Sequence, residues 1–180
     1  MGKVRIKGKK KLDKAILAEV IPFGIQSAKL SNEYAYYYED ESISYKLNCG
    51  AVEDEWFNEF LEERFGYKCK GSAESFVLSI LHEVGHHKAN DEIEGAILDF
   101  CNTEKERIDR EMQDADAERS KVLEWQYFNL PDEIMATQWA INYAKKHPKK
   151  IIKMWKAIEP VIIDLYRKNL NHEIFEELNK

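Results

Sequence analysis

Apolar side chains recur at helical spacing along most of the chain. A stripe over residues 11–21 is ended by Pro22 and Gly24, and a second stripe over residues 53–65 is closed by Gly66. Similar patterns predict three more helices, over residues 72–87, 131–147 and 149–169. The chain is therefore expected to be mostly helical.

Two segments depart from this pattern. Residues 33–47 hold two runs rich in tyrosine, isoleucine and serine around an acidic turn, Glu39 to Glu41, which predicts a β-hairpin. Residues 102–125 are charged nearly all round and predict one helix, exposed on most sides or covered by a partner. We find no repeat and no linker, so residues 1–180 are expected to form one α+β domain, mostly helical with a small β-hairpin.

Composition and charge narrow the possible functions. Apolar residues make up 44% of the chain and aromatic residues 12%, as in a globular protein. The net charge of −6 argues against nucleic acid as the main partner, because such binding needs a positive field. Residues 1–12 are strongly basic and predict a flexible arm. Such an arm can contact nucleic acid or an acidic partner, but solvated lysines at a frayed terminus are the more common explanation.

The cysteines and the hydropathy bear on location. The chain has three cysteines, an odd number, and no two of them have C-x-x-C spacing: Cys49, Cys69 and Cys101. This favours free thiols in a reducing cytosol. No apolar run resembles a signal peptide or a membrane span. We therefore expect a soluble, cytoplasmic protein without a membrane partner.

The segment "LHEVGHH" carries the candidate chemistry. Three of the five histidines of the chain lie in it, and His82, Glu83 and His86 form H-E-x-x-H. Residues four apart lie on one face of a helix, so the two histidines can bind one metal ion while Glu83 activates its water. A polar patch on a helix surface is the alternative.

The positions on the helix favour the metal site. At about 100° per residue, His82 and His86 point away from the apolar face around Ile80 and Val84, so they are not expected to be buried core histidines. Gly85 costs stability in mid-helix and often marks close approach of another backbone. His87 is turned towards the apolar side, which suggests a structural or supporting role.

Two carboxylates compete for the third position that catalytic zinc usually has. Glu92 stands where the longer motif H-E-x-x-H-x-x-G-x-x-H has its last histidine, but Ala89 replaces the glycine of that motif. Glu133 heads a stripe of small residues, Ala136, Thr137, Ala140 and Ala144, that lets two helices pack closely. Glu133 is therefore the better candidate, although an alanine-rich packing face with a glutamate at the helix dipole would look the same.

"HEVGH" followed by "EIMATQWA" resembles the minimal gluzincin metallopeptidases, in particular the ImmA/IrrE-like proteins of phages and mobile elements. The resemblance spans about residues 30–145, and only the two motifs are specific. Members of that family commonly carry a glutamate directly before the motif alanine, where this chain has Met135. The resemblance implies a zincin-like fold and a zinc-dependent endopeptidase directed at a regulatory protein.

On this hypothesis His82, His86 and Glu133 bind zinc, and Glu83 is general base and then acid. The edge of the hairpin binds an extended protein or peptide substrate by strand addition. Tyr143, His147 and His172 are equal candidates for the oxyanion donor. Two alternatives remain open, a metal-stabilised interaction module and a metal-free phage-type regulator.

Overall fold

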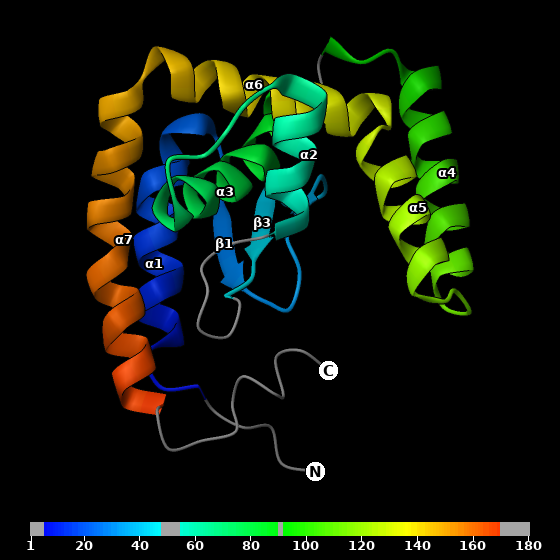
Figure 1. The fold of residues 1–180 in the computed structure, drawn as a ribbon. Coiled ribbons are helices and arrows are strands. Elements are labelled where there is room, and N and C mark those ends of the chain that lie inside the picture. Colours follow the sequence, from blue (N-terminus) through cyan, green and yellow to red (C-terminus); the bar gives the residue numbers. More distant parts are fainter. Residues whose placement is uncertain (1–5, 48–54, 90–91, 170–180) are drawn as a thin grey trace.

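In the computed structural model, residues 6–47, 55–89 and 92–169 are described (Figure 1). Of the described residues, 73% are helical, and three strands form a small sheet, which confirms the expected mostly helical α+β fold. The elements in chain order are α1 (Lys9–Val20), a 3-10 turn η1 (Ile21–Phe23), β1 (Ser27–Leu30), β2 (Ala35–Tyr37), β3 (Ser42–Tyr45), α2 (Glu55–Phe65), α3 (Ser72–Ala89), α4 (Gly95–Met112), α5 (Ala117–Phe128), α6 (Pro131–Lys146) and α7 (Pro148–Asn169).

The predicted hairpin forms, with β2 antiparallel to β3 and Tyr36 opposite Ile43. A third strand, β1, was not predicted, and it pairs with β3 in parallel. The strand order is β1-β3-β2, so β2 lies at an edge of the sheet. This edge borders the candidate site described below.

Helix α3 lies in the middle of the molecule and is buried on nearly all sides. Phe76, Ile80 and Val84 face one core, which α3 shares with α1, the sheet and α7. Val77 and Leu81 face a second core, shared with α2, α6 and α7. The apolar positions of α3 thus serve two faces of the helix, where the sequence predicted one.

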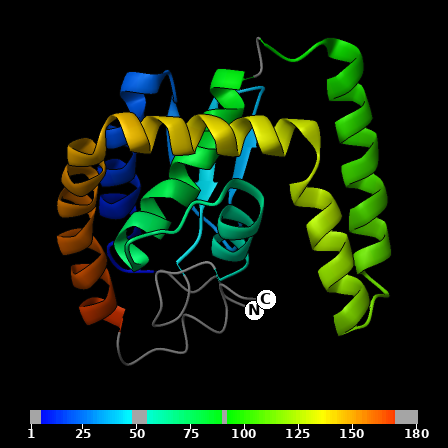
Figure 2. The same ribbon diagram turned by 45° about the horizontal axis from the view of Figure 1, so that its top comes forward.

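The charged segment 102–125 is not one helix. It forms parts of α4 and α5, which lie side by side as a helical hairpin at one end of the molecule (Figures 1 and 2). The break has a local cause, because the side chain of Asp116 caps α5 by accepting a hydrogen bond of 2.8 Å from the backbone nitrogen of Arg119. Cys101, Ile108, Leu123 and Leu130 form a small core of their own there. We call α4 and α5 the arm.

The flexible basic segment expected over residues 1–12 is not supported where the structure describes it. Residues 1–5 lie outside the described part of the chain, but α1 begins at Lys9 and Leu12 is fully buried. The Lys9 ammonium donates to the carbonyl of Leu30, and Asp13 accepts a hydrogen bond of 2.8 Å from the backbone nitrogen of Leu30. Residues 9–12 are therefore part of the folded domain.

Candidate metal centre

Three side chains from two helices converge between α3 and α6. His82 Nε2 lies 3.2 Å from His86 Nε2 and 3.0 Å from Glu133 Oε2. His86 Nε2 lies 3.5 Å from Glu133 Oε1. This group can hold a metal ion.

The spacing of these atoms fits zinc. Ligand atoms about 2.0–2.1 Å from a tetrahedral zinc ion are about 3.3 Å from one another. The three separations of 3.2, 3.0 and 3.5 Å lie close to that value. Two imidazoles and one carboxylate are also a donor set that catalytic zinc sites use.

The histidines are buried, which the sequence did not predict. His82 is 5% exposed, His86 8% and Glu133 2%. The two rings do point away from Ile80 and Val84, but α6 covers them, and the ring centroid of Phe57 in α2 lies 5.4 Å from that of His82. A helical wheel considers one helix alone and does not show which neighbours cover its polar face.

Gly85 explains how α6 can lie so near. A Cβ atom at this position would stand 2.3 Å from the carbonyl oxygen of Ala136, far inside van der Waals contact. The expected close approach of another backbone is therefore confirmed. It also brings Thr137 Oγ1 within 3.0 Å of His82 Nδ1. When His82 donates from Nδ1 to this hydroxyl, its Nε2 lone pair remains available for a metal ion.

The two candidates for the third ligand differ in position. Glu133 is in the first turn of α6, where Pro131 starts the helix and the dipole favours a carboxylate. Burial raises the pKa of Glu133, but His86, His82 and Lys105 outweigh it and hold that pKa well below its usual range. Glu92 is exposed and does not belong to the group. Only Glu133 is placed to serve as the third ligand.

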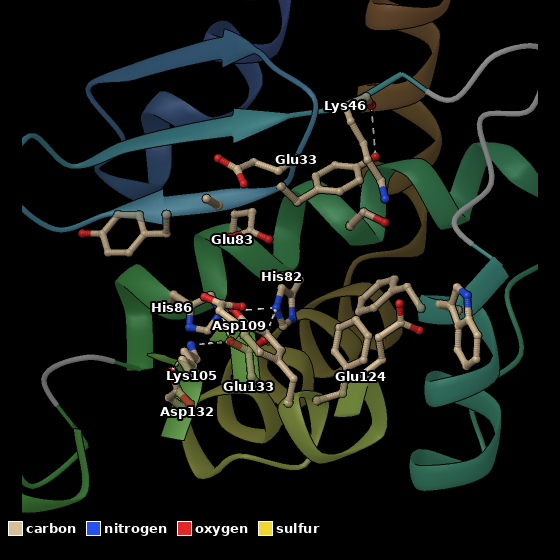
Figure 3. Close-up of a pocket in the computed structure, with 18 of the residues that line it drawn as sticks. Glu33, Lys46, His82, Glu83, His86, Lys105, Asp109, Glu124, Asp132 and Glu133 are labelled. Carbon is tan, nitrogen blue, oxygen red and sulfur yellow. Dashed lines mark hydrogen bonds and ion pairs between the residues drawn. The ribbon is translucent and has the colours of Figure 1, made fainter. Parts of the chain in front are cut away.

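Lys105 was not expected at the site. Its ammonium reaches from α4 and lies 2.5 Å from Glu133 Oε1 and 2.5 Å from Asp132 Oδ2 (Figure 3). Burial lowers the pKa of Lys105, but the carboxylates of Glu133 and Asp132 raise it above its ordinary value, so the side chain remains a cation. The arm is thus tied to the first turn of α6 by ion pairs from one partly buried lysine to two buried carboxylates.

Glu83 lies between the histidines and the sheet (Figure 3). It is nearly buried, and burial raises the pKa of its carboxyl to about 7, while His82 lowers that pKa and Glu133 raises it. A carboxyl with a pKa near neutrality can both take up and release a proton at physiological pH. Glu83 is therefore suited to proton transfer beside the histidines.

These residues open onto a cleft of about 590 Å³. The strand β2 and its flanks form one wall, with Tyr36 and Tyr38 among its residues. Helices α2, α4 and α5 form the other walls, and their lining residues include Trp56, Phe57, Asn102, Lys105, Asp109, Met112, Glu124, Tyr127 and Phe128. His82, Glu83, His86 and Glu133 line the same cleft.

His87 is outside the group, as expected. Its Nδ1 lies 2.8 Å from the hydroxyl of Tyr36, so it links β2 to α3. Two of the candidate oxyanion donors, Tyr143 and His147, pack against each other with ring centroids 4.7 Å apart and do not line the cleft. The third, His172, lies outside the described residues.

Comparisons of the chain with models of protein families, with curated proteins and with solved structures found no match. Within residues 6–47, 55–89 and 92–169, no helix combines the length and the apolar character needed to cross a membrane. The site brings together a buried donor set for one metal ion, a carboxyl with a pKa of about 7 and an open cleft. Such an arrangement is suited to metal-assisted hydrolysis.

Proposed function

We propose that the protein is a zinc-dependent metallopeptidase that hydrolyses a peptide bond in a protein or peptide substrate. The observation that carries the proposal is the buried group of His82, His86 and Glu133, whose donor atoms have the spacing of zinc ligands and line a cleft together with Glu83. The resemblance of "HEVGH" and "EIMATQWA" to ImmA/IrrE-like gluzincins points the same way. It further suggests a regulatory protein of a phage or its host as the substrate.

Each residue has a defined task in this proposal. His82, His86 and Glu133 would hold the zinc, which when bound would act as a Lewis acid on a carbonyl group and lower the pKa of water to about 7. Glu83 takes a proton from the attacking water as the water oxygen bonds to the carbonyl carbon. Glu83 then gives this proton to the amine nitrogen as the C–N bond breaks. One water is consumed, and one carboxyl and one amine are formed.

The cleft supports an extended substrate. Strand β2 is an edge strand on the cleft wall, so its outer backbone groups are available to pair with a peptide. Tyr36 of this strand is bound to His87 of α3, which fixes the distance between the edge and the histidines. A peptide paired with β2 would therefore run alongside Glu83.

The proposal places the protein in the cytoplasm, where a peptidase could meet a regulatory protein of phage or host. The free thiol of Cys101 is consistent with a reducing compartment.

A metal-stabilised interaction module is less well supported. Structural zinc sites are closed by four protein ligands, whereas here three candidate ligands line an open cleft. A structural site also has no need for Glu83, whose nearly buried carboxyl is retained beside the histidines at a desolvation cost. Two histidines and a carboxylate also serve iron in oxygenases, so the identity of the metal needs a direct measurement.

The first test is metal content by elemental mass spectrometry, for the wild type, Glu133→Ala and the matched control Glu92→Ala. We expect about one zinc per chain in the wild type and in Glu92→Ala, and a clear loss in Glu133→Ala. Iron in place of zinc would overturn the choice of metal. No bound metal after addition of zinc would overturn the whole proposal and favour the metal-free regulator.

The second test is cleavage of fluorescently labelled casein by the zinc-loaded protein. Glu83→Gln is expected to keep its zinc and lose cleavage, because the amide cannot accept the proton of the attacking water. Cleavage by Glu83→Gln at the wild-type rate would contradict the proposed mechanism.

A further inference from the structure

Hydrolysis of a peptide bond needs a hydrogen-bond donor for the negative charge that develops on the carbonyl oxygen. The residues assigned above do not supply one. Glu133 and Glu83 are carboxylates, and both Nε2 atoms of His82 and His86 face the metal position. On the proposed function, on which this inference rests, the donor must be another side chain on the cleft wall.

Several donors of the cleft wall already have partners. Lys105 is held between two carboxylates. Three tyrosines of the β2 wall have partners for their hydroxyls: Tyr34 donates to the carbonyl of Lys46 at 3.3 Å, Tyr36 pairs with His87 at 2.8 Å, and Tyr37 donates to Glu33 at 3.4 Å. Two tyrosines remain, Tyr38 on the β2 wall and Tyr127 in the last turn of α5.

Tyr127 is the one beside the candidate ligands. The Lys105 ammonium lies 5.1 Å from the centroid of the Tyr127 ring and 2.5 Å from Glu133 Oε1. The ring and the carboxylate therefore both lie next to the same cation. In the described part of the chain, we find no hydrogen bond to the Tyr127 hydroxyl. This hydroxyl is thus a donor on the cleft wall that the folded protein does not use.

The surroundings of the two tyrosines differ. Burial and the carboxylate of Glu133 raise the pKa of Tyr127, with a smaller contribution from Glu83. Burial, Asp132 and Glu133 raise the pKa of Tyr38, while Lys105 lowers it, and Glu83 is not among the charges that act on it. Both tyrosines thus lie near the candidate ligand Glu133, and of the two only Tyr127 also lies near the candidate base Glu83.

The position of Tyr127 is fixed from two sides. The ring of its neighbour Phe128 stacks on Phe60 of α2 with centroids 5.1 Å apart. Lys105 lies over the ring of Tyr127 from α4. A donor held in place before the reaction costs no reorganisation at the moment when charge develops.

We propose that the Tyr127 hydroxyl donates the hydrogen bond that stabilises the oxyanion during peptide hydrolysis, and that Lys105 positions its ring. The hydroxyl keeps its proton throughout, so Glu83 alone transfers protons. The arm would then supply a catalytic residue to the cleft in addition to forming its wall.

The test compares Tyr127→Phe with Tyr143→Phe, a matched change outside the cleft. Phenylalanine keeps the ring under Lys105 and removes only the donor. With labelled casein, kcat is expected to fall about 100-fold or more in Tyr127→Phe, with KM and zinc content near the wild-type values. Tyr143→Phe is expected to cleave at the wild-type rate.

A binding measurement gives a readout that does not need turnover. A phosphoramidate dipeptide presents a tetrahedral anion where the oxyanion would form, and calorimetry measures its affinity for the zinc-loaded protein. We expect Tyr127→Phe to weaken this binding about 10- to 100-fold, the usual size of a hydrogen bond to a charged group. The affinity of 2-mercaptoethanol, which presents no tetrahedral anion, should stay unchanged.

The results separate the two proposals. If Glu83→Gln cleaves casein at the wild-type rate, the proposed mechanism is overturned. The phosphoramidate measurement still tests Tyr127 in that case. The assignment of Tyr127 is overturned if Tyr127→Phe binds the phosphoramidate as tightly as the wild type, or if the wild type does not bind it. It is also overturned if Tyr38→Phe, and not Tyr127→Phe, loses affinity for the phosphoramidate.

Discussion

The Lys105 ammonium lies 2.5 Å from Glu133 Oε1, although the two residues come from helices that meet only near the start of α6. Asp132 accepts from the same ammonium, so one partly buried cation neutralises two buried neighbouring carboxylates. The contact holds Glu133 at the position where it faces His82 and His86. Lys105 therefore belongs to the arm and also contacts a candidate metal ligand.

Lys105→Met is expected to destabilise the metal-free protein by about 3 kcal/mol, because it leaves two buried carboxylates without their cation. Urea denaturation of the metal-free protein measures the effect. Lys153→Met, which changes an exposed lysine of α7, serves as the control and should stay within about 0.5 kcal/mol of the wild type. Equal denaturation midpoints for both variants would show that the ion pair contributes nothing.

Thr137→Val is expected to weaken zinc binding about 10- to 100-fold, since it removes the hydroxyl 3.0 Å from His82 Nδ1 that orients the ring. Competition with a chromophoric chelator measures the affinity. Thr103→Val is the matched control, because the Thr103 hydroxyl is exposed on α4 and bonds only within its own helix. If both variants bind zinc as the wild type does, Thr137 does not orient His82.

Zinc is expected to raise the thermal midpoint of unfolding. At a free concentration about 100 times the Kd, binding adds about 2.7 kcal/mol, which corresponds to about 5–10 °C for a chain of this length. Scanning calorimetry with zinc and with excess chelator measures the difference. Glu83→Gln should keep the shift and Glu133→Ala should lose most of it. A shift of equal size in Glu133→Ala would place the bound zinc elsewhere.

The sequence predicted the helices whose apolar stripes end at clear stop signals. Gly24 and Gly66 both have positive φ, and the helices before them end as expected. Strand β1 was missed because it lies outside the two tyrosine- and serine-rich runs and pairs with β3 in parallel, without a tight turn to mark the pairing. The break between α4 and α5 was missed because Asp116, which caps α5, stands among other charged residues and has no distinctive pattern.

The site was predictable where spacing along one helix determines it. His82, Glu83 and His86 follow from the motif, and Glu133 follows from the stripe of small residues that packs against Gly85. Lys105 and Tyr127 could not be found in this way. Their place at the cleft depends on how the arm docks on α2 and α6, and nothing periodic in the sequence of α4 or α5 indicates it.

Gly85→Ala is expected to destabilise the protein by about 1–3 kcal/mol and to weaken zinc binding, although alanine is the better helix former by about 1 kcal/mol. The added methyl group would meet the carbonyl oxygen of Ala136 at 2.3 Å, and a backbone atom of a packed helix cannot turn aside as a side chain can. Helix α6 would have to move away, which lengthens the 3.0 Å separation of His82 Nε2 and Glu133 Oε2. Gly95→Ala is the matched control, since nothing lies within 4 Å of its Cβ position in α4. Denaturation and chelator competition measure both effects. A Gly85→Ala protein as stable and as tight in zinc binding as Gly95→Ala would mean that close contact of α3 and α6 is not what forms the site.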